Sequence, residues 1–264
     1  MAASVLITGS SGLIGRYVLE QWDLPEARLV LVDRGVDDLL SAGVPSALIQ
    51  AHAPTVVVHL AWSASGTAGY RSSPDNDRWV AASIELAQAC RASGAWFIGT
   101  GTSLDEGGES FDAYTSSKIS IRLALQSAID SGEITWLRPY YVFDAEIGRP
   151  ALVAEAIAAR GRGEPIELRS PGSEHDFILA VDVARAIVSV VRHGIRGVVQ
   201  IGSGELRTVE ELVSALGVES TAAPDRGPSV PQLHDRADPS ALFEIGWVPE
   251  ATSAFFLRSR ESGN

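Results

Sequence analysis

The sequence predicts an α/β fold in which helices flank a doubly wound parallel sheet. First, short runs of β-branched and aromatic residues alternate with longer segments that have apolar residues at helical spacing, which is typical of parallel sheets. Second, a glycine-rich turn directly follows the first apolar run. Third, 264 residues suffice for one large α/β domain or for a large domain with a small lobe, and no Gly/Ser-rich or Pro-rich linker divides the middle of the chain.

The first strand and helix are predicted at residues 3–8 and 12–22, from V-L-I-T-G-S-S-G-L-I-G near the N-terminus. Gly9 permits the tight turn, Gly12 lets the backbone approach a pyrophosphate, and Gly15 lets the helix pack closely on the strand. The N–H groups and the positive dipole end of that helix would hold the pyrophosphate. A glycine triplet alone also fits an ordinary turn, so the interpretation depends on the next strand as well.

The second strand, residues 28–33, ends on Asp33, where a dinucleotide-binding fold has its ribose-binding acid. A carboxylate there accepts hydrogen bonds from both ribose hydroxyls and repels a 2′-phosphate, which favours NAD. Arg34 can neutralise that charge and bind the phosphate, so NADP stays open. Leu39 is predicted to lie over the adenine, and the alternative is that it belongs to the solvated start of a helix.

Each later strand is again a short apolar run, and each later helix is a longer segment with one apolar face. The strands are predicted near residues 55–60, 95–100, 133–138 and 198–201, and the helices near 45–52, 75–93, 111–130, 150–160 and 180–192. The predicted fold is a Rossmann-type sheet with a small C-terminal substrate-binding lobe. The dinucleotide-binding core is predicted at residues 1–140, with 173–202 returning to it, and the lobe at residues 141–172 and 203–264.

The composition excludes several classes of function. The chain has 33 acidic and 21 basic residues, a net charge of −12, which disfavours nucleic acid or an anionic membrane as a partner. Its one cysteine, Cys90, excludes an internal disulfide and a multi-cysteine zinc site, and we predict no metal. No basic segment precedes the N-terminal apolar run, which is too short for a signal peptide or a membrane span. A cytoplasmic protein is predicted.

The third strand ends in V-V-V-H-L-A-W, and small residues past a strand end suit a cofactor that lies across the edge of the sheet. Leu60 and Ala61 are therefore candidate cofactor contacts. His59 is expected to pack or hydrogen-bond structurally. Trp62 is a candidate to flank a substrate, and the alternative is that it covers apolar surface.

The fourth strand leads to Thr102 and Ser103, and the next predicted helix carries Y-T-S-S-K. Tyr114 and Lys118 share one helical face, which can place the ammonium beside the phenol oxygen. At about 4 Å and an effective dielectric near 20, that charge favours phenolate by about 4 kcal/mol, or roughly three pKa units. Such a tyrosine can exchange a proton with a carbinol oxygen that Thr102 holds in place. The alternative is an ordinary surface Tyr–Lys pair.

Together these motifs resemble the extended short-chain dehydrogenase/reductase family, in particular its NAD-dependent epimerase/dehydratase type that acts on nucleotide sugars. The resemblance covers nearly the whole chain. T-G-S-S-G-L-I-G is similar to the family's T-G-x-x-G-x-x-G, H-L-A-W to its H-L-A-A, and Y-T-S-S-K to its Y-x-x-x-K. Further matches to family motifs lie at residues 137–143, 175–184, 201–204, 236–239 and 246–249.

The resemblance implies a set of site residues. The catalytic residues are Thr102, Tyr114 and Lys118. The cofactor-binding residues are Gly9, Ser11, Gly12, Leu13, Ile14, Gly15, Asp33, Arg34, Leu39, Leu60, Ala61, Tyr114, Lys118 and Tyr140. The substrate-binding residues are Trp62, Ser103, Tyr141, Arg149 and Arg236. Tyr141 replaces the family's asparagine and His175 its arginine, so arginines elsewhere would have to hold a diphosphate.

Departures from the family pattern narrow the reaction. Family 4,6-dehydratases follow the catalytic threonine with Asp-Glu, whereas Ser103 stands there in this chain. Dehydration is therefore disfavoured, although Asp105 and Glu106 lie close enough to keep it open. The 3,5-epimerising members need a further cysteine, and Cys90 lies too far upstream to reach the site. The remaining hydroxyl, phenol and ammonium suffice for hydride transfer at one carbinol carbon.

Three functions follow as hypotheses. The first is a nucleotide-sugar ketoreductase, for example one that reduces a 4-keto-6-deoxyhexose attached to a nucleoside diphosphate. The second is a 4-epimerase with permanently bound NAD. The third is a non-catalytic dinucleotide sensor that binds a partner protein, although the intact catalytic set argues against it. A homodimer through the helix of Tyr114 and the preceding helix is expected from the family. The apolar residues available there, which the core can equally use, are Leu86, Ala89, Ile119, Leu123 and Leu125.

Overall fold

The computed structural model describes residues 3–63, 68–106, 112–223 and 236–261. The chain forms two compact units, Met1–Arg138 with Ile187–Val199 and Pro139–Ala186 with Gln200–Asn264. Each unit has a hydrophobic core of its own. That one unit binds the cofactor and the other the substrate stays a prediction.

The first unit is built around a six-stranded sheet with the strand order β10-β5-β4-β3-β1-β2. Its strands are β1 (Ser4–Thr8), β2 (Arg28–Leu31), β3 (Val56–His59), β4 (Trp96–Thr100), β5 (Ile134–Pro139) and β10 (Gly197–Ile201). β1 pairs in parallel with both β2 and β3, and parallel pairing continues through β4 to β5. The chain order therefore reverses beside β1, and ligands of such sheets bind outside the carboxyl ends of the strands at this reversal.

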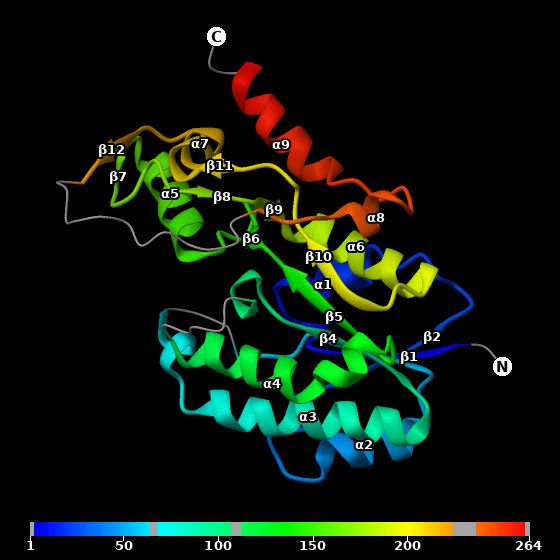
Figure 1. Cartoon of the computed structure of the whole chain (residues 1–264). Coiled ribbons are helices and arrows are strands. Elements are labelled where there is room, and N and C mark those ends of the chain that lie inside the picture. The colour runs from blue at the N-terminus through cyan, green and yellow to red at the C-terminus, as the bar shows by residue number, and fades with distance from the viewer. Residues whose placement is uncertain (1–2, 64–67, 107–111, 224–235, 262–264) are drawn as a thin grey trace. The chain divides into compact units, whose positions relative to one another are not determined.

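Helices cover both faces of this sheet, as the doubly wound prediction requires. In Figure 1, α2 (Val44–His52), α3 (Asp75–Ser93) and α4 (Ala113–Asp130) lie side by side on one face, and α1 (Leu13–Glu20) lies on the other. Large side chains fill the core of this unit, among them Trp79, Leu86, Phe97, Ile121 and Trp136. Because the central strands are covered on both faces, their sequences are nearly continuous apolar runs. The predicted fold class is confirmed.

The remaining elements of the sequence prediction are α5 (Ala151–Arg162) and α6 (Ala180–His193). All six predicted strands and all six predicted helices are present, to within two residues at each end. Two short 3₁₀ helices, η1 (Ala68–Ser72) and η2 (Ser103–Asp105), were not predicted.

The second unit contains small paired strands and helices that the sequence did not predict. Its strands are β6 (Tyr141–Phe143), β7 (Ile166–Leu168), β8 (Glu174–His175), β9 (Phe177–Leu179), β11 (Arg207–Thr208) and β12 (Ser220–Ala222). They pair as β6 with β9, β8 with β11 and β7 with β12. The further helices are α7 (Val209–Ala215), α8 (Ser240–Phe243) and α9 (Glu250–Glu261). Phe143, Val153, Phe177, Leu212 and Phe256 are among the residues of this unit's core.

Three further features of the described residues concern membrane spans, metal sites and the single cysteine. No helix in the described ranges is long and apolar enough to cross a membrane. Nor do these ranges contain a group of three or more His, Cys, Asp or Glu side chains that could hold a metal ion. Cys90 is buried in α3, and this burial raises the pKa of its thiol to about 12. Because the thiolate is the reactive form of cysteine, the buried and protonated thiol of Cys90 acts as a core side chain.

Candidate active site

The glycine-rich turn between β1 and α1 has the close packing that the sequence predicted. Gly9 has a φ of 73°, and a Cβ added there would lie 2.6 Å from the backbone nitrogen of Ala61. A Cβ at Gly15 would lie 2.1 Å from the carbonyl oxygen of Gly9. Gly12 is exposed at the N-cap of α1 and donates a hydrogen bond to Gly9 O at 3.0 Å. The turn therefore leaves the first N–H groups of α1 uncovered by a side chain at Gly12, which suits a phosphate.

The packing of Gly15 gives a stability prediction. Gly15→Ala should lower the free energy of unfolding by about 1–3 kcal/mol, the usual cost of forcing extra atoms into a filled site. Gly161→Ala is the matched control, because nothing lies within 4 Å of the added Cβ in α5, and alanine is favoured over glycine inside a helix. Denaturant unfolding of both variants measures the difference. Equal midpoints for Gly15→Ala and the wild type would show that α1 is not packed tightly on the turn.

Asp33 lies in a turn two residues after β2, as its predicted contact with ribose requires. Its Oδ1 accepts a hydrogen bond from Gly35 N at 2.8 Å, which fixes the carboxylate at the end of the strand. Asp33 and Arg34 are both exposed. Leu39 instead belongs to the hydrophobic core and is 6% exposed, which leaves little of its side chain for an adenine ring.

The residues after β3 are held against β1. Leu60 N donates to the carbonyl oxygen of Thr8, and Ala61 N donates to Thr8 Oγ1, both at 3.2 Å. The His59 ring bonds on both sides, through Nδ1 to Thr8 Oγ1 at 2.7 Å and through Nε2 to Ser83 Oγ at 3.0 Å. Burial lowers the pKa of His59 to about 3, with a smaller contribution from the positive charge of Lys118. His59 is thus a neutral, structural residue, as expected from the sequence.

Lys118 is the only lysine in the chain, and it lies buried on α4. Its Nζ donates to the carbonyl oxygen of Thr100 at 2.8 Å. The ammonium is 5.8 Å from the ring centroid of Tyr114 on the same helix. Burial lowers the pKa of Lys118 to about 7, and the negative charge of Asp105 opposes this effect. The structure thus brings the predicted lysine and tyrosine to one side of α4, at the end of β4.

Tyr114 lies among aromatic rings, in edge-on contact with Trp62 at 5.7 Å and with Tyr70 at 5.1 Å between centroids. Burial raises the pKa of Tyr114 above its usual value, and the charge of Arg71 acts in the opposite direction. The lowered tyrosine pKa that was predicted from the Tyr–Lys spacing is therefore wrong for the protein without ligand. Burial disfavours the phenolate by more than the charge of Arg71 favours it.

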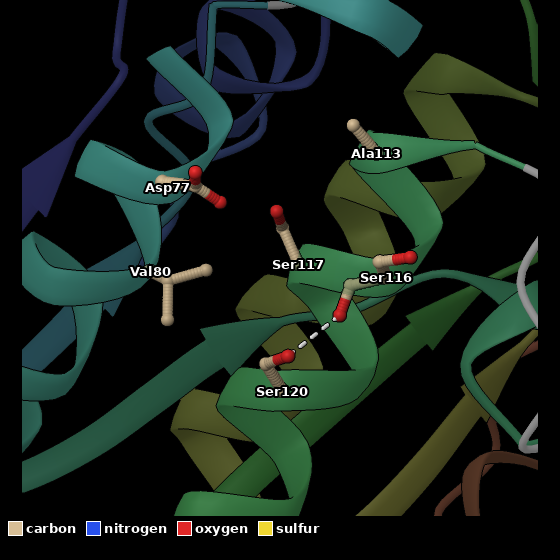
Figure 2. A pocket seen from close by; sticks show the side chains of 6 residues that line it. All are labelled: Asp77, Val80, Ala113, Ser116, Ser117 and Ser120. Carbon is tan, nitrogen blue, oxygen red and sulfur yellow. Dashed lines mark hydrogen bonds between the residues drawn. The ribbon is translucent and has the colours of Figure 1, made fainter. Parts of the chain in front are cut away.

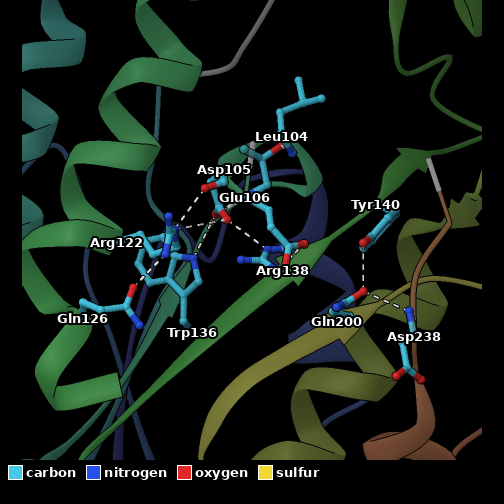
Figure 3. Close-up of polar contacts among 11 residues, drawn as sticks. Leu104, Asp105, Glu106, Arg122, Gln126, Trp136, Arg138, Tyr140, Gln200 and Asp238 are labelled. Carbon is cyan, nitrogen blue, oxygen red and sulfur yellow. Dashed lines mark hydrogen bonds and ion pairs between the residues drawn. The ribbon is translucent and has the colours of Figure 1, made fainter. Parts of the chain in front are cut away.

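Thr102 is the N-cap of η2 and is tied to a buried carboxylate. Its backbone nitrogen donates to Asp105 Oδ2 at 3.0 Å. Trp136 Nε1 donates to the same oxygen, and Arg138 Nε donates to Asp105 Oδ1, both at 2.9 Å. Arg138 also donates to Glu106 Oε2 at 3.0 Å, as Figure 3 shows. The two carboxylates that kept dehydration open are thus both bound by one arginine.

Other predicted residues have different surroundings. Ser103 is 5% exposed, so it offers little surface to a substrate. Tyr140 is buried in the second unit, and its hydroxyl donates to Gln200 Oε1 at 2.8 Å (Figure 3). Tyr141 lies against the ring of His175, with 4.0 Å between the centroids. The cofactor and substrate contacts proposed for residues of this unit stay predictions.

Sequence reasoning missed Asp176, which organises the second unit. Its carboxylate accepts hydrogen bonds from Ser203 N, Gly204 N and Ala237 N at 2.6, 2.8 and 3.0 Å. The bond from Ala237 N fixes the backbone next to Arg236, one of the predicted phosphate-binding residues. Asp176 belongs to the family motif at residues 175–184, so the sequence did mark it. The sequence alone could not show that its carboxylate accepts hydrogen bonds from three backbone N–H groups of distant residues.

Taken together, a glycine turn at the strand reversal, a carboxylate after β2 and a Tyr–Lys pair on the helix after β4 define an NAD(P)-linked short-chain dehydrogenase/reductase. Residues 5–202 match the family model described as the NAD dependent epimerase/dehydratase family. The chain belongs to this family. The predicted family is confirmed, and with it the class of enzyme and the NAD(P) cofactor.

Solved structures show the same fold at low sequence identity. UDP-glucose 4-epimerase of Thermus thermophilus in complex with NAD is 22% identical, with a TM-score of 0.72 over 93% of this chain and 94% of that one. UDP-glucose 4-epimerase of Thermotoga maritima with UDP-glucose is also 22% identical, with a TM-score of 0.73 over 93% of both chains. dTDP-4-dehydrorhamnose reductase of Bacillus anthracis str. Ames in complex with NADP is 14% identical, with a TM-score of 0.75 over 98% and 99%. Comparison with curated proteins finds no match.

Proposed function

We propose that the protein is a ketoreductase that transfers hydride to one carbonyl carbon of a nucleotide sugar, such as a 4-keto-6-deoxyhexose on a nucleoside diphosphate. The observation that carries this proposal is the pairing of both Asp105 and Glu106 with Arg138. These carboxylates are occupied, so Thr102, Tyr114 and Lys118 remain for the chemistry. Similarity to a dTDP-4-dehydrorhamnose reductase supports the choice of substrate class.

The residues of this chain have separate tasks in the proposed reaction. Tyr114 donates its phenolic proton to the carbonyl oxygen as that oxygen becomes a hydroxyl. The raised pKa of Tyr114 keeps this proton in place at neutral pH. The Lys118 ammonium compensates the charge that develops on the phenol oxygen, and the Thr102 hydroxyl holds the reacting oxygen. When bound on the glycine turn, the reduced dinucleotide supplies the hydride.

The direct test is to add NADH or NADPH and a nucleoside diphosphate 4-keto-6-deoxyhexose to the purified protein. Oxidation of the cofactor in step with formation of the 4-hydroxy sugar supports the proposal. Mass spectrometry of small molecules retained by the protein identifies the nucleotide and the dinucleotide at the same time. Absence of cofactor oxidation with every such ketosugar would overturn the ketoreductase proposal.

A 4-epimerase is the second candidate, because two of the similar structures are UDP-glucose 4-epimerases. Such an enzyme needs the same hydroxyl, phenol and ammonium, since it oxidises and reduces a single carbon. It differs in keeping its cofactor through the cycle. NAD that copurifies with the protein, together with turnover of a nucleotide sugar without added NAD(P)H, would identify this reaction.

The position of Asp33 predicts a preference for NAD(H) over NADP(H). Asp33→Ala should weaken NAD(H) binding by about 10- to 150-fold, because hydrogen bonds to a charged group contribute about 1.5–3 kcal/mol. The same change should improve NADP(H) binding by removing a charge that repels the 2′-phosphate. Isothermal titration of both cofactors with both proteins measures the change. Arg34→Ala is the matched control, expected to weaken NADP(H) binding more than NAD(H) binding. Tighter binding of NADPH than of NADH by the wild type would contradict the assignment.

The proposed grip on the substrate diphosphate uses Arg149 and Arg236 of the second unit. Guanidinium groups suit phosphate because they present paired N–H donors. Arg236 is exposed, and the bond from Ala237 N to Asp176 at 3.0 Å anchors the adjoining backbone. This arrangement supports a phosphate contact by Arg236 in particular.

We further propose a cytoplasmic homodimer that associates through α3 and α4. Leu86, Ile119 and Leu125 are buried in the core, so they are unavailable to a partner. Leu123 on α4 is 58% exposed. Figure 2 shows a groove between the two helices, and the side chains that line it are those of Asp77, Val80, Ala113, Ser116, Ser117 and Ser120. Sedimentation equilibrium of the wild type and of Leu123→Glu tests whether a second copy covers this face.

A further inference from the structure

The surroundings of Lys118 contain a contact that the proposed reaction does not use. Its ammonium has three N–H donors. Within the part of the chain that the structure describes, Thr100 O is the one hydrogen-bond acceptor of Nζ. The second neighbour is not an oxygen but the ring of Trp62, whose centroid lies 3.8 Å from Nζ.

Trp62 is itself held in place by α3. Its Nε1 donates to Asn76 Oδ1 at 3.2 Å, and its ring stacks on Trp79 with 5.7 Å between centroids and 25° between planes. Trp79 is buried, and its own Nε1 donates to Ser63 Oγ at 3.1 Å. The Trp62 indole is thus held in one position next to Lys118 by contacts to α3.

We propose that Trp62 is a positioning residue for Lys118, whose ammonium it holds at the end of β4 and keeps charged by presenting the face of its indole. The electron-rich face of an aromatic ring attracts a cation, most strongly when water is excluded. The buried ammonium has lost most of its water, so the ring replaces part of that stabilisation. The proposal rests on the proposed function only for the task given to Lys118, because the contact itself is independent of any reaction.

This contact is also where the chain departs from the family pattern. The family's H-L-A-A has a small residue at the position of Trp62, and H-L-A-W matches it elsewhere. An alanine has no ring to offer a lysine. Trp62 therefore adds a cation–π contact to Lys118 that the shared motif does not specify.

The charged and titratable groups around Lys118 come from several elements. Asp105 of η2 favours the ammonium. His59 of β3 is neutral, because burial lowers its pKa to about 3. Tyr114 lies on the same helix. From η1, Tyr70 contacts the Tyr114 ring, and the charge of Arg71 acts to lower the pKa of Tyr114. The α3 side chains that stack on or hydrogen-bond to Trp62, those of Trp79 and Asn76, are uncharged.

Since the pKa of Lys118 lies at about 7, a small change in its surroundings decides its charge at neutral pH. Removing a group that favours the ammonium lowers the pKa. The variant amine then loses its proton at a lower pH than the wild type does.

The experiment uses the single lysine of the chain. Protein grown on lysine labelled with ¹³C at Cε alone gives one side-chain NMR signal, which reports the titration of Lys118 without ligand or substrate. Trp62→Met, which fills space without a ring, should lower the pKa of Lys118 by about 1 unit, the size expected for a buried cation–π contact. Trp62→Phe retains a weaker ring and should give an intermediate decrease. If the Met variant does not fold, the Phe variant still tests the proposal.

Trp79→Leu is the matched control, because it removes a buried indole from the same cluster without removing the ring beside Nζ. Its Lys118 should titrate as in the wild type. An unchanged pKa in the Met and Phe variants, or an equal decrease in Trp79→Leu, would overturn the proposal.

Turnover separates this inference from the proposed function. If the charged ammonium is needed, the basic limb of the pH–rate profile moves to lower pH in Trp62→Met together with the NMR titration. A shifted titration with an unmoved basic limb supports the Trp62–Lys118 contact and overturns the role of Lys118 in turnover.

Discussion

Tyr114→Phe should lower kcat by about 10² to 10⁴, the usual contribution of a placed acid or base, and should leave dinucleotide binding unchanged. The phenol oxygen is the atom that the proposed reaction uses as proton donor. The ring itself packs against Trp62 and Tyr70, and phenylalanine preserves those edge-on contacts. Steady-state rates with a nucleotide ketosugar, together with titration of NADH, measure the two effects separately.

Tyr70→Phe is the matched control for this variant. It removes a second phenol from the same aromatic cluster while Tyr114 keeps its hydroxyl, so its loss of kcat should be far smaller. Near-normal turnover in Tyr114→Phe would remove Tyr114 from the role of proton donor. An equal loss in both variants would instead show that the cluster acts through packing.

The sheet was predictable because its signals are local. Strands β1, β3, β4 and β5 are almost fully buried, and each is a mainly apolar run with few polar residues. The second unit has no such signal. β8 is only Glu174–His175 and β11 only Arg207–Thr208, and strands of two polar residues have no periodicity to read. Their pairing depends on contacts between distant parts of the chain.

The same distinction applies to the site. Tyr114 and Lys118 share a face because they are one helical turn apart, and the glycines of the first turn are adjacent in sequence. Asp105 and Arg138 are 33 positions apart, and nothing local links them. The pKa of Tyr114 was predicted in the wrong direction because a pairwise charge estimate includes the spacing of two residues but not their burial, which is a property of the whole fold.

Asp105→Asn should lower the free energy of unfolding by about 3–5 kcal/mol, the usual cost of removing one partner of a buried charge pair. Asp105 is fully buried, and Arg138 is nearly so. The asparagine keeps the shape but removes the charge. In the wild type both carboxylate oxygens of Asp105 accept hydrogen bonds, from Thr102 N, Trp136 Nε1 and Arg138 Nε. The side-chain nitrogen of the asparagine is a donor and cannot accept any of them. Denaturant unfolding at neutral pH measures the loss.

Glu106→Gln is the control for Asp105→Asn, because Glu106 pairs with the same arginine but is partly exposed, and such pairs contribute about 0–1 kcal/mol. The double variant Asp105→Leu/Arg138→Met should unfold at a higher denaturant concentration than Asp105→Leu alone, since it also removes the buried Arg138 charge that Asp105 no longer balances. Asp105 also anchors the backbone of Thr102, so turnover should fall in Asp105→Asn as the reacting oxygen loses its fixed partner. Full stability combined with abolished turnover would reverse this interpretation. Asp105 would then be a chemical group rather than a structural anion, and dehydration would return as a reaction of this site.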